Sequence, residues 1–205
     1  AVLLKMRLVG IVGRSCSGKS TYIAENYKYK IDFDKIVKDL WDDIFTAPVI
    51  LKKLESHGIY ASKYIGQVEK ALIRVALEDP IKNAIIRNTM KPYIEASYRE
   101  KLHQINEQII TDNIDDVVQV AIDAPMLIEY GNLTLVNNNI IQVVTDYNTC
   151  VERIMKRDYL SMDSAKGRLK AQLDPIEIKD KWVESRNKYN YGTYEEITGN
   201  KNERI

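Results

Sequence analysis

The segment 13–20 constrains the fold of this chain more than any other stretch. It reads Gly-Arg-Ser-Cys-Ser-Gly-Lys-Ser, so glycines at its first and sixth positions are followed by a lysine and a hydroxyl residue. An apolar run, 8–12, precedes it, and the residues from Lys19 to about Tyr27 have a helical pattern. A strand, a loop of this spacing and a helix together form a phosphate-binding loop, or P-loop. The chain is therefore predicted to hold a nucleotide phosphate on an α/β fold.

Each residue type in this loop has a physical use. Glycine lets the backbone bend and approach phosphate, Lys19 reaches the terminal phosphates, and the Ser20 hydroxyl is a ligand for Mg²⁺. Cys16 has two interpretations: the nearby amides and Lys19 would make its thiol oxidisable, or it is a small residue that fits, which we favour. The residues assigned to ATP binding here are Gly13, Arg14, Ser15, Cys16, Ser17, Gly18, Lys19, Ser20 and Thr21.

Strand-like and helix-like segments alternate along the rest of the chain. Apolar, β-branched runs end near Ile31 and fill 117–122 and 140–144, and a helical pattern covers 34–45. Residues 48–113 have an almost wholly helical pattern. Two charged helical segments, 150–157 and 162–172, precede a polar tail. The alternation is typical of an α/β fold with a parallel sheet, here with a helical insertion.

The composition argues against several classes of protein. The 205 residues include 30 basic and 29 acidic side chains, a net charge of +1, so nucleic acid and anionic membranes are not expected partners. Cys16 and Cys150 have no Cys or His at ligand spacing, which argues against a disulfide framework and a zinc site. No stretch approaches the ~18 apolar residues that a membrane-spanning helix needs. We therefore expect a soluble, cytoplasmic protein.

The motifs after the P-loop distinguish a kinase from a GTPase. A GTPase would carry Asp-x-x-Gly after a strand and Asn-Lys-x-Asp for guanine. The first motif is absent, and the nearest approach to the second, 187–190, reads Asn-Lys-Tyr-Asn. A nucleic-acid motor would be longer and more basic than this chain. The sequence therefore favours a small-molecule kinase.

Four further motifs, in order along 8–197, resemble those of dephospho-coenzyme A kinases. An Asp-x-Asp, Asp32 and Asp34, follows the P-loop helix. The segment 123–129, Asp-Ala-Pro-Met-Leu-Ile-Glu, is similar to the family's Pro-Leu-Leu-Phe-Glu-like motif after a later strand. An arginine-rich stretch, 153–158 and then 168–172, is similar to the family's lid, and Asn190-Tyr-Gly-Thr stands where the family has Asn-x-Gly-Ser/Thr before a short helix.

The resemblance implies an architecture as well as an activity. It implies a P-loop NTPase-type three-layer sandwich with a parallel sheet, a helical acceptor-binding insertion and an arginine-bearing lid. The expected single domain, 1–205, has a core of 1–47, 114–150 and 173–205, an insertion of 48–113 and a lid of 151–172. ATP and Mg²⁺ are the implied substrate and cofactor.

The resemblance and the sheet geometry together suggest roles for the carboxylates. Asp32 and Asp34 follow a strand, near the sheet edge where ligands of open α/β folds bind. Asp34 is our choice for the base that accepts the proton of the attacking hydroxyl, with Asp32 as its close rival. Asp34 would serve equally as a helix N-cap. Asp123 is expected to hold Mg²⁺ through water, although a turn-forming aspartate is the other interpretation.

The arginines are the candidates for stabilising the transferred phosphoryl group. Arg153 and Arg157 are four residues apart on one helix face, so both would point at one anion, and Arg168 would complete the lid. Spacing by itself is equally compatible with a solvated helix face. The resemblance favours the functional interpretation and adds Asn190 as an ATP-binding residue.

The acceptor segment departs most from the family pattern, so three functions remain open. The family usually has an Asp-Arg pair and a His-Pro, where this chain reads Gln-Val-Glu-Lys at 67–70 and Met-Lys-Pro at 90–92. The leading hypothesis is phosphorylation of the ribose 3′-hydroxyl of dephospho-coenzyme A. The alternatives are a nucleoside or deoxynucleoside monophosphate kinase and a non-catalytic ATP-binding protein.

Overall fold

The computed structural model describes residues 5–64, 67–124, 127–129 and 131–199. The chain divides into two compact units. The first, here called the sheet unit, consists of Ala1–Asp32 and Gln108–Ile205, and the second, the helical unit, is Phe33–Glu107. No helix in the described part of the chain is long and apolar enough to cross a membrane.

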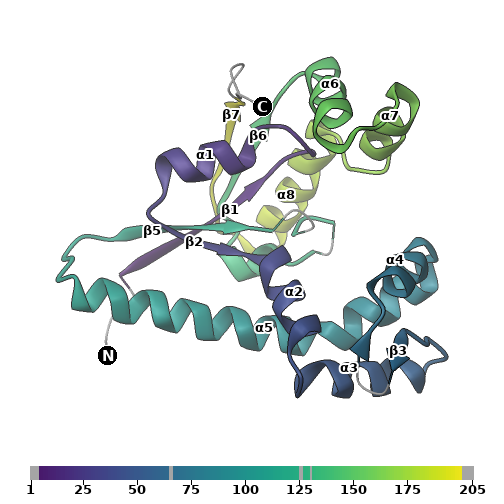
Figure 1. The fold of residues 1–205 in the computed structure, drawn as a ribbon. Coiled ribbons are helices and arrows are strands. Elements are labelled where there is room, and N and C mark those ends of the chain that lie inside the picture. Colours follow the sequence, from purple (N-terminus) through teal and green to yellow (C-terminus); the bar gives the residue numbers. More distant parts are fainter. Residues whose placement is uncertain (1–4, 65–66, 125–126, 130, 200–205) are drawn as a thin grey trace. The chain divides into compact units, whose positions relative to one another are not determined.

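The sheet unit contains one sheet of five parallel strands, in the order β2-β5-β1-β6-β7 (Figure 1). The strands are β1 (Met6–Val12), β2 (Tyr29–Asp32), β5 (Val118–Asp123), β6 (Ile140–Val144) and β7 (Tyr194–Thr198). The predicted parallel sheet is therefore confirmed. Strand β1 lies at its centre, so the loop that follows β1 is held by a strand paired on both sides.

Helices cover both faces of this sheet. Ile141 and Val143 of β6 join the buried cluster around Ile23 of α1. The intervening side chain, Gln142, points to the opposite face, because side chains alternate along a strand. There its Nε2 donates to the Pro175 carbonyl at the start of α8, 3.3 Å away. Helices α1 and α8 therefore lie on opposite faces, which gives the predicted three layers. The helices of this unit are α1 (Lys19–Asn26), α6 (Tyr147–Asp158), α7 (Met162–Lys170) and α8 (Pro175–Tyr189).

The C-terminal segment that we predicted as a polar tail contains a helix and a strand. Asp174 begins α8 with a capping box, since its carboxylate accepts hydrogen bonds from the amides of Ile176 and Glu177, both at 2.8 Å. The Glu177 carboxylate accepts in return from the Asp174 amide at 2.7 Å. Pro175 occupies the first helical position, where its missing N–H costs nothing. The signal for this helix was present in the sequence.

The family resemblance implied a short helix after 190–193, and this prediction is wrong. Tyr194–Thr198 is strand β7, which pairs in parallel with β6 from Ile140↔Tyr194 to Val144↔Thr198. Its tyrosine, isoleucine and threonine favour strands. The Tyr194 hydroxyl also donates to Oε1 of the buried Gln142 at 2.7 Å. This pairing with a distant strand decides the conformation of the segment.

The helical unit contains α2, α3, α4 and most of α5. Helix α2 falls in the helical pattern predicted over 34–45, and the other three fall mainly in the helical pattern of 48–113. An antiparallel pair, β3 with β4, was not predicted. The core of the unit includes Ile36, Trp41, Ile50 and Leu54, all buried. Its elements are α2 (Phe33–Asp42), α3 (Thr46–Glu55), β3 (Ser62–Tyr64), β4 (Gln67–Val68), α4 (Lys70–Glu78) and α5 (Pro80–Thr111).

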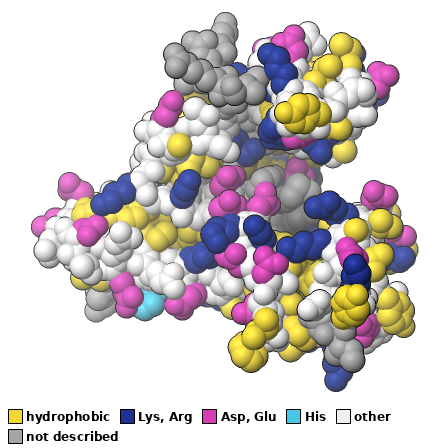
Figure 2. Space-filling model, in the orientation of Figure 1, with side chains coloured by type: hydrophobic (Ala, Val, Ile, Leu, Met, Phe, Trp, Pro, Cys, Tyr) yellow, Lys and Arg dark blue, Asp and Glu magenta, His cyan; other side chains and the backbone are white. Residues whose placement is uncertain are grey.

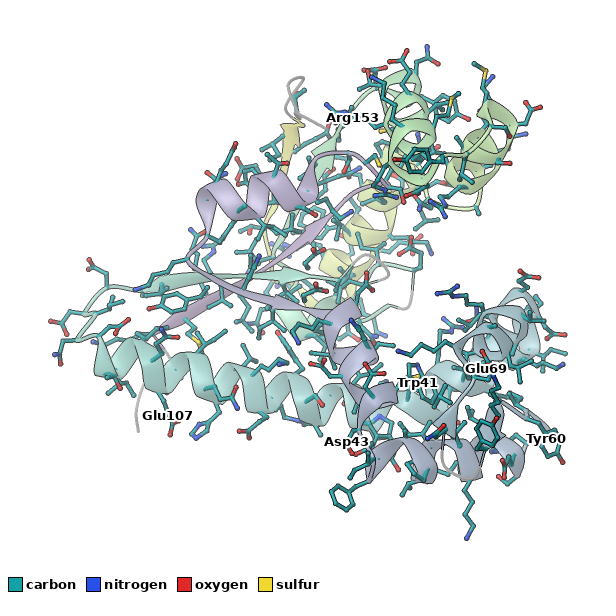
Figure 3. All side chains as sticks on the ribbon, in the orientation of Figure 1. Trp41, Asp43, Tyr60, Glu69, Glu107 and Arg153 are labelled. Carbon is teal, nitrogen blue, oxygen red and sulfur yellow. The ribbon has the colours of Figure 1, made fainter. Side chains whose placement is uncertain are left out.

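Helix α2 ends earlier than the predicted boundary near Phe45, at Asp42. The cause is Asp43, labelled in Figure 3, whose carboxylate accepts hydrogen bonds from the amides of Phe45 (3.0 Å) and Thr46 (2.7 Å). Such a cap starts α3 and competes with continuation of α2. Aspartate favours this use over a place in a helix interior.

Candidate active site

The P-loop has the backbone conformation that its glycines were expected to provide. Gly13 and Gly18 adopt positive φ angles of 151° and 100°. A Cβ on Gly13 would lie 2.5 Å from the Val143 carbonyl oxygen and 2.7 Å from Ser17 Oγ, so no side chain fits there. The loop therefore packs its backbone against β6, with the Ser17 hydroxyl beside Gly13.

The start of α1 is suited to an anion. Gly18 is the N-cap, no side chain caps the helix, and its first turn carries no acidic residue. The amides of that turn are therefore not screened by a carboxylate and carry the positive end of the helix dipole. Lys19 folds back so that Nζ donates to the Gly13 carbonyl at 3.2 Å. Ser20 is exposed and Thr21 half-buried in the same turn. These features fit the phosphates of a nucleotide.

Two side chains hold the loop from outside. Thr145 Oγ1 donates to the Ser17 carbonyl at 2.7 Å, and Arg153 Nη1 donates to the Cys16 carbonyl at 3.1 Å. Arg153, labelled in Figure 3, is only 8% exposed. The prediction paired Arg153 with Arg157 on one anion, whereas the structure directs the Arg153 guanidinium to the P-loop backbone. Its position supports the loop.

Cys16 packs as a small residue in this arrangement. Its φ is 60°, and its side chain lies against the buried cluster that includes Cys150, Ile154 and Leu169. These residues belong to α6 and α7, which are called the lid helices here after the predicted lid, 151–172. Burial raises the pKa of the Cys150 thiol above its usual range. The packing is consistent with the favoured interpretation of Cys16 as a residue that fits its space.

The lid helices bring Arg157 and Arg168 together on one carboxylate. Arg157 donates to Asp158 from both Nε and Nη2, each at 2.8 Å, and Arg168 Nη1 also donates to Asp158. Hydrogen bonds from Arg157, aided by Arg168, lower the pKa of Asp158 to about 2. Tyr159 and Met162, between and at the start of these helices, are exposed, and Figure 2 shows hydrophobic and charged side chains mixed on the visible face of this region. Asp158 is a site residue to which sequence reasoning gave no role.

Two of the predicted carboxylates lie on the neighbouring strands β2 and β5, and β5 is paired with the P-loop strand β1. Asp32 ends β2 and Asp123 ends β5, and the two are Cα partners in the sheet register. Asp123 is also the partner of Ile11 in β1, just before the loop. The carboxyl ends of parallel strands form the ligand-binding edge of such sheets. Asp34 lies in the first turn of α2, in the helical unit.

Glu129 is a further titratable group, which the sequence analysis quoted only as part of a motif. Burial raises the pKa of its carboxyl group, and the nearby Lys181 and Lys19 lower it in part. Pro125 and Met126 of the same motif lie outside the described residues.

Asn190 has a local structural role. It is the C-cap of α8 with φ 59°, and its Oδ1 accepts a hydrogen bond from Arg186 Nη1 at 3.1 Å. Asparagine tolerates this left-handed conformation better than most residues. Its predicted contact with ATP stays a prediction.

Comparisons with known proteins point to one family. The family model described as dephospho-CoA kinase matches residues 7–185. The dephospho-CoA kinase of Fusobacterium nucleatum is 26% identical over 173 residues, which cover 83% of each chain. A dephospho-CoA kinase domain-containing protein of Danio rerio is 27% identical over 187 residues, 85% of this chain and 73% of the relative. The Oryza sativa dephospho-CoA kinase is 26% identical over 180 residues, 82% of this chain and 70% of the relative.

A solved structure agrees with the fold. A crystal structure of a Thermus thermophilus protein superposes with a TM-score of 0.62 at 23% identity, covering 94% of this chain and 88% of that chain. The family match spans the P-loop, the sheet edge and the lid helices described above. The chain belongs to the dephospho-CoA kinase family, a family of ATP-dependent kinases.

Proposed function

We propose that this chain transfers the γ-phosphoryl group of ATP to the ribose 3′-hydroxyl of dephospho-coenzyme A, giving coenzyme A and ADP. The observation that carries the proposal is the start of α1, which no side chain caps, behind a P-loop whose Gly13 has no room for a side chain, within a chain that matches the family over 7–185. Phosphoryl transfer depends mostly on positioning and charge neutralisation, which such a loop supplies.

The P-loop would bind the triphosphate. The amides at the start of α1 would donate to the phosphate oxygens, and Lys19 would exchange the Gly13 carbonyl for the β- and γ-phosphates. Ser20 and Asp123 are the residues proposed to hold Mg²⁺, Ser20 directly and Asp123 through water. Bound there, the ion would neutralise charge on the phosphates. Ser20 is exposed in the first turn of α1, and Asp123 ends the strand next to β1.

Asp34 is proposed to accept the proton of the attacking hydroxyl, with Asp32 as the alternative. A carboxylate near that hydroxyl lets the proton leave as the phosphorus–oxygen bond forms. Arg157 and Arg168 are proposed to turn from Asp158 to the phosphoryl oxygens, since two guanidiniums on one carboxylate are already arranged for an anion. Arg153 is proposed to act by holding the loop.

The acceptor is the part of the proposal that a second candidate challenges. In the helical unit, Glu69 stands where the family usually has an Asp-Arg pair, and its side chain caps α4 by accepting from the Ala71 amide at 3.4 Å (Figure 3). Its own amide donates to the Ala61 carbonyl at 2.7 Å. Because this stretch departs from the family pattern, a nucleoside or deoxynucleoside monophosphate is the second candidate acceptor.

A panel of acceptors in a coupled ADP-release assay distinguishes the two candidates. With ATP fixed and each acceptor at millimolar concentration, dephospho-coenzyme A is expected to stimulate ADP release, and the nucleoside monophosphates are not. Stimulation by a monophosphate with none by dephospho-coenzyme A would establish the second candidate instead.

Asp34→Ala tests for a catalytic function against an ATP-binding one. The variant is expected to bind ATP normally and to lose acceptor-dependent ADP release. If neither the parent nor the variant forms ADP with any acceptor while both bind ATP tightly, the chain is a non-catalytic ATP-binding protein. Asp32→Ala in parallel identifies which carboxylate is the base.

We also propose that the segment 48–113 is the acceptor insertion, that 151–172 is the lid, and that the enzyme works in the reducing cytoplasm. The first two follow from the family resemblance. The third rests on the sequence, in which the two cysteines lie far apart and have no Cys or His at ligand spacing.

A further inference from the structure

Gln172 makes two hydrogen bonds to a single residue of the P-loop. Its Oε1 accepts from the Ser15 amide at 2.9 Å, and its Nε2 donates to Ser15 Oγ at 2.7 Å. The carboxamide group therefore presents its acceptor and its donor to one partner. These hydrogen bonds connect two residues that lie 157 positions apart in the sequence.

The backbone that carries Gln172 is fixed on both sides. Its amide donates to the Leu169 carbonyl at 3.1 Å, at the end of α7. Two residues later, Asp174 begins α8 with its capping box. Between them, the Leu173 carbonyl accepts from Arg14 Nε at 3.4 Å. The connection between the lid and α8 is thus tied to both residues at the apex of the P-loop, Arg14 and Ser15.

Three carbonyls of the loop accept hydrogen bonds from other side chains. The Gly13 carbonyl accepts from Lys19, the Cys16 carbonyl from Arg153, and the Ser17 carbonyl from Thr145. At the apex, a hydrogen bond from the Ser17 amide to the Arg14 carbonyl, 3.1 Å, closes a turn within the loop itself. Gln172 and Leu173 add the hydrogen bonds to Ser15 and Arg14, the first two residues of this turn.

We infer that Gln172 is a positioning residue for ATP, which holds the apex of the P-loop ready and couples it to the end of the lid. A loop already held in its binding conformation loses less entropy when the phosphates arrive. Gln172 acts through Ser15 and does not itself touch the nucleotide. The inference deepens the proposed function and rests on one part of it, that the P-loop binds ATP. The test therefore uses no acceptor.

The test measures the loop and the nucleotide separately. Hydrogen exchange of the Ser15 amide is followed by NMR in the nucleotide-free protein, and affinity is measured with Mg²⁺ and a non-hydrolysable ATP analogue. Gln172→Ala is expected to speed exchange of that amide and to weaken the analogue about 5- to 30-fold, the change that one or two net hydrogen bonds produce. In turnover, KM for ATP should rise while kcat changes little.

Two further variants connect the effect to Ser15. Ser15→Ala removes the hydroxyl contact but keeps the amide contact, so it should weaken the analogue less than Gln172→Ala. In the Gln172→Ala background it should add nothing, because the hydroxyl has already lost its partner. Gln119→Ala, at an exposed position in β5, is the matched control and should change neither measurement.

Several results would overturn the inference. It fails if Gln172→Ala leaves the exchange of the Ser15 amide unchanged, whatever happens to affinity, or if exchange quickens while the analogue binds within twofold of the parent. If Gln172→Ala does not fold, Gln172→Asn takes its place, since its shorter side chain withdraws the amide from Ser15. If dephospho-coenzyme A proves not to be the acceptor, the exchange and affinity measurements are unaffected. The proposed reaction and the role of Gln172 can therefore be refuted independently.

Discussion

Replacing Arg153 by methionine should destabilise the chain because Arg153 holds the P-loop from a buried position. The residue is 8% exposed, and its guanidinium donates to the Cys16 carbonyl at 3.1 Å. A hydrogen bond made by a charged group contributes about 1.5–3 kcal/mol. Since 1 kcal/mol shifts Tm by about 2–4 °C at this chain length, Arg153→Met should lower Tm by about 3–12 °C.

Arg157→Met is the matched control for this experiment. It is the same substitution one helical turn further along α6, but its side chain is 54% exposed and pairs with Asp158 at the surface. Exposed ion pairs contribute little to stability. Urea unfolding and thermal melts of the two variants should therefore show the larger loss for Arg153→Met, together with weaker ATP binding.

The reasoning is refuted if Arg153→Met is as stable as the parent or loses less stability than Arg157→Met. Unchanged stability with a large loss of turnover would mean that the guanidinium acts on the nucleotide, as the family resemblance first suggested. Arg153→Lys is informative in either case. A lysine keeps the charge but lacks the planar fork of donors, so it should recover only part of the stability.

Three further predictions follow from single residues near the loop. Gly199→Ala should lower the free energy of unfolding in urea by about 1–3 kcal/mol, because a Cβ there would collide with the Ser17 carbonyl. Gly167→Ala, in open space on α7, should raise it by about 0.5–1 kcal/mol. A Gly199→Ala variant more stable than Gly167→Ala would contradict the packing around Ser17. Burial raises the pKa of Glu129, so folding favours its protonated form and ionised Glu129 costs stability above its folded pKa. Glu129→Gln should therefore raise Tm at mildly alkaline pH and lose this advantage as the pH falls, and a lower Tm at alkaline pH would refute the cause. Hydrogen bonds from Arg157 lower the pKa of Asp158 to about 2, so its contribution to stability should be complete above the unfolded pKa of about 3.9 and disappear as the pH falls through about 2; NMR titration of the carboxyl carbon checks this, and a midpoint near 4 would contradict the ion pairs.

Local sequence signals predicted the part of the fold that holds phosphate. The strand, loop and helix around Gly13 are determined by neighbouring residues, and strand β6 was predicted with its observed bounds, Ile140–Val144. A buried parallel strand is a continuous β-branched run, so its signal is strong. The capping box at Asp174 was an equally local signal, and its use would have identified α8.

Other features depend on partners that are distant in sequence. Strand β7 forms because Tyr194–Thr198 pairs with β6, and nothing within the segment excludes a helix. The contacts of Gln172 with Ser15, and of Arg153 with Cys16, join segments more than one hundred residues apart. Helical spacing placed Arg153 and Arg157 on one face but does not reveal that one reaches the loop and the other Asp158.

The most direct test of the account is the identity of the phosphorylated product. The parent protein is incubated with Mg²⁺, ATP and dephospho-coenzyme A, and the products are separated and examined by phosphorus NMR and mass spectrometry. The account predicts one new phosphate monoester on the ribose 3′-oxygen, formed in equal amount to ADP and absent with Asp34→Ala. ADP formed without a phosphorylated acceptor, or a phosphoryl group found at any other position, would contradict it.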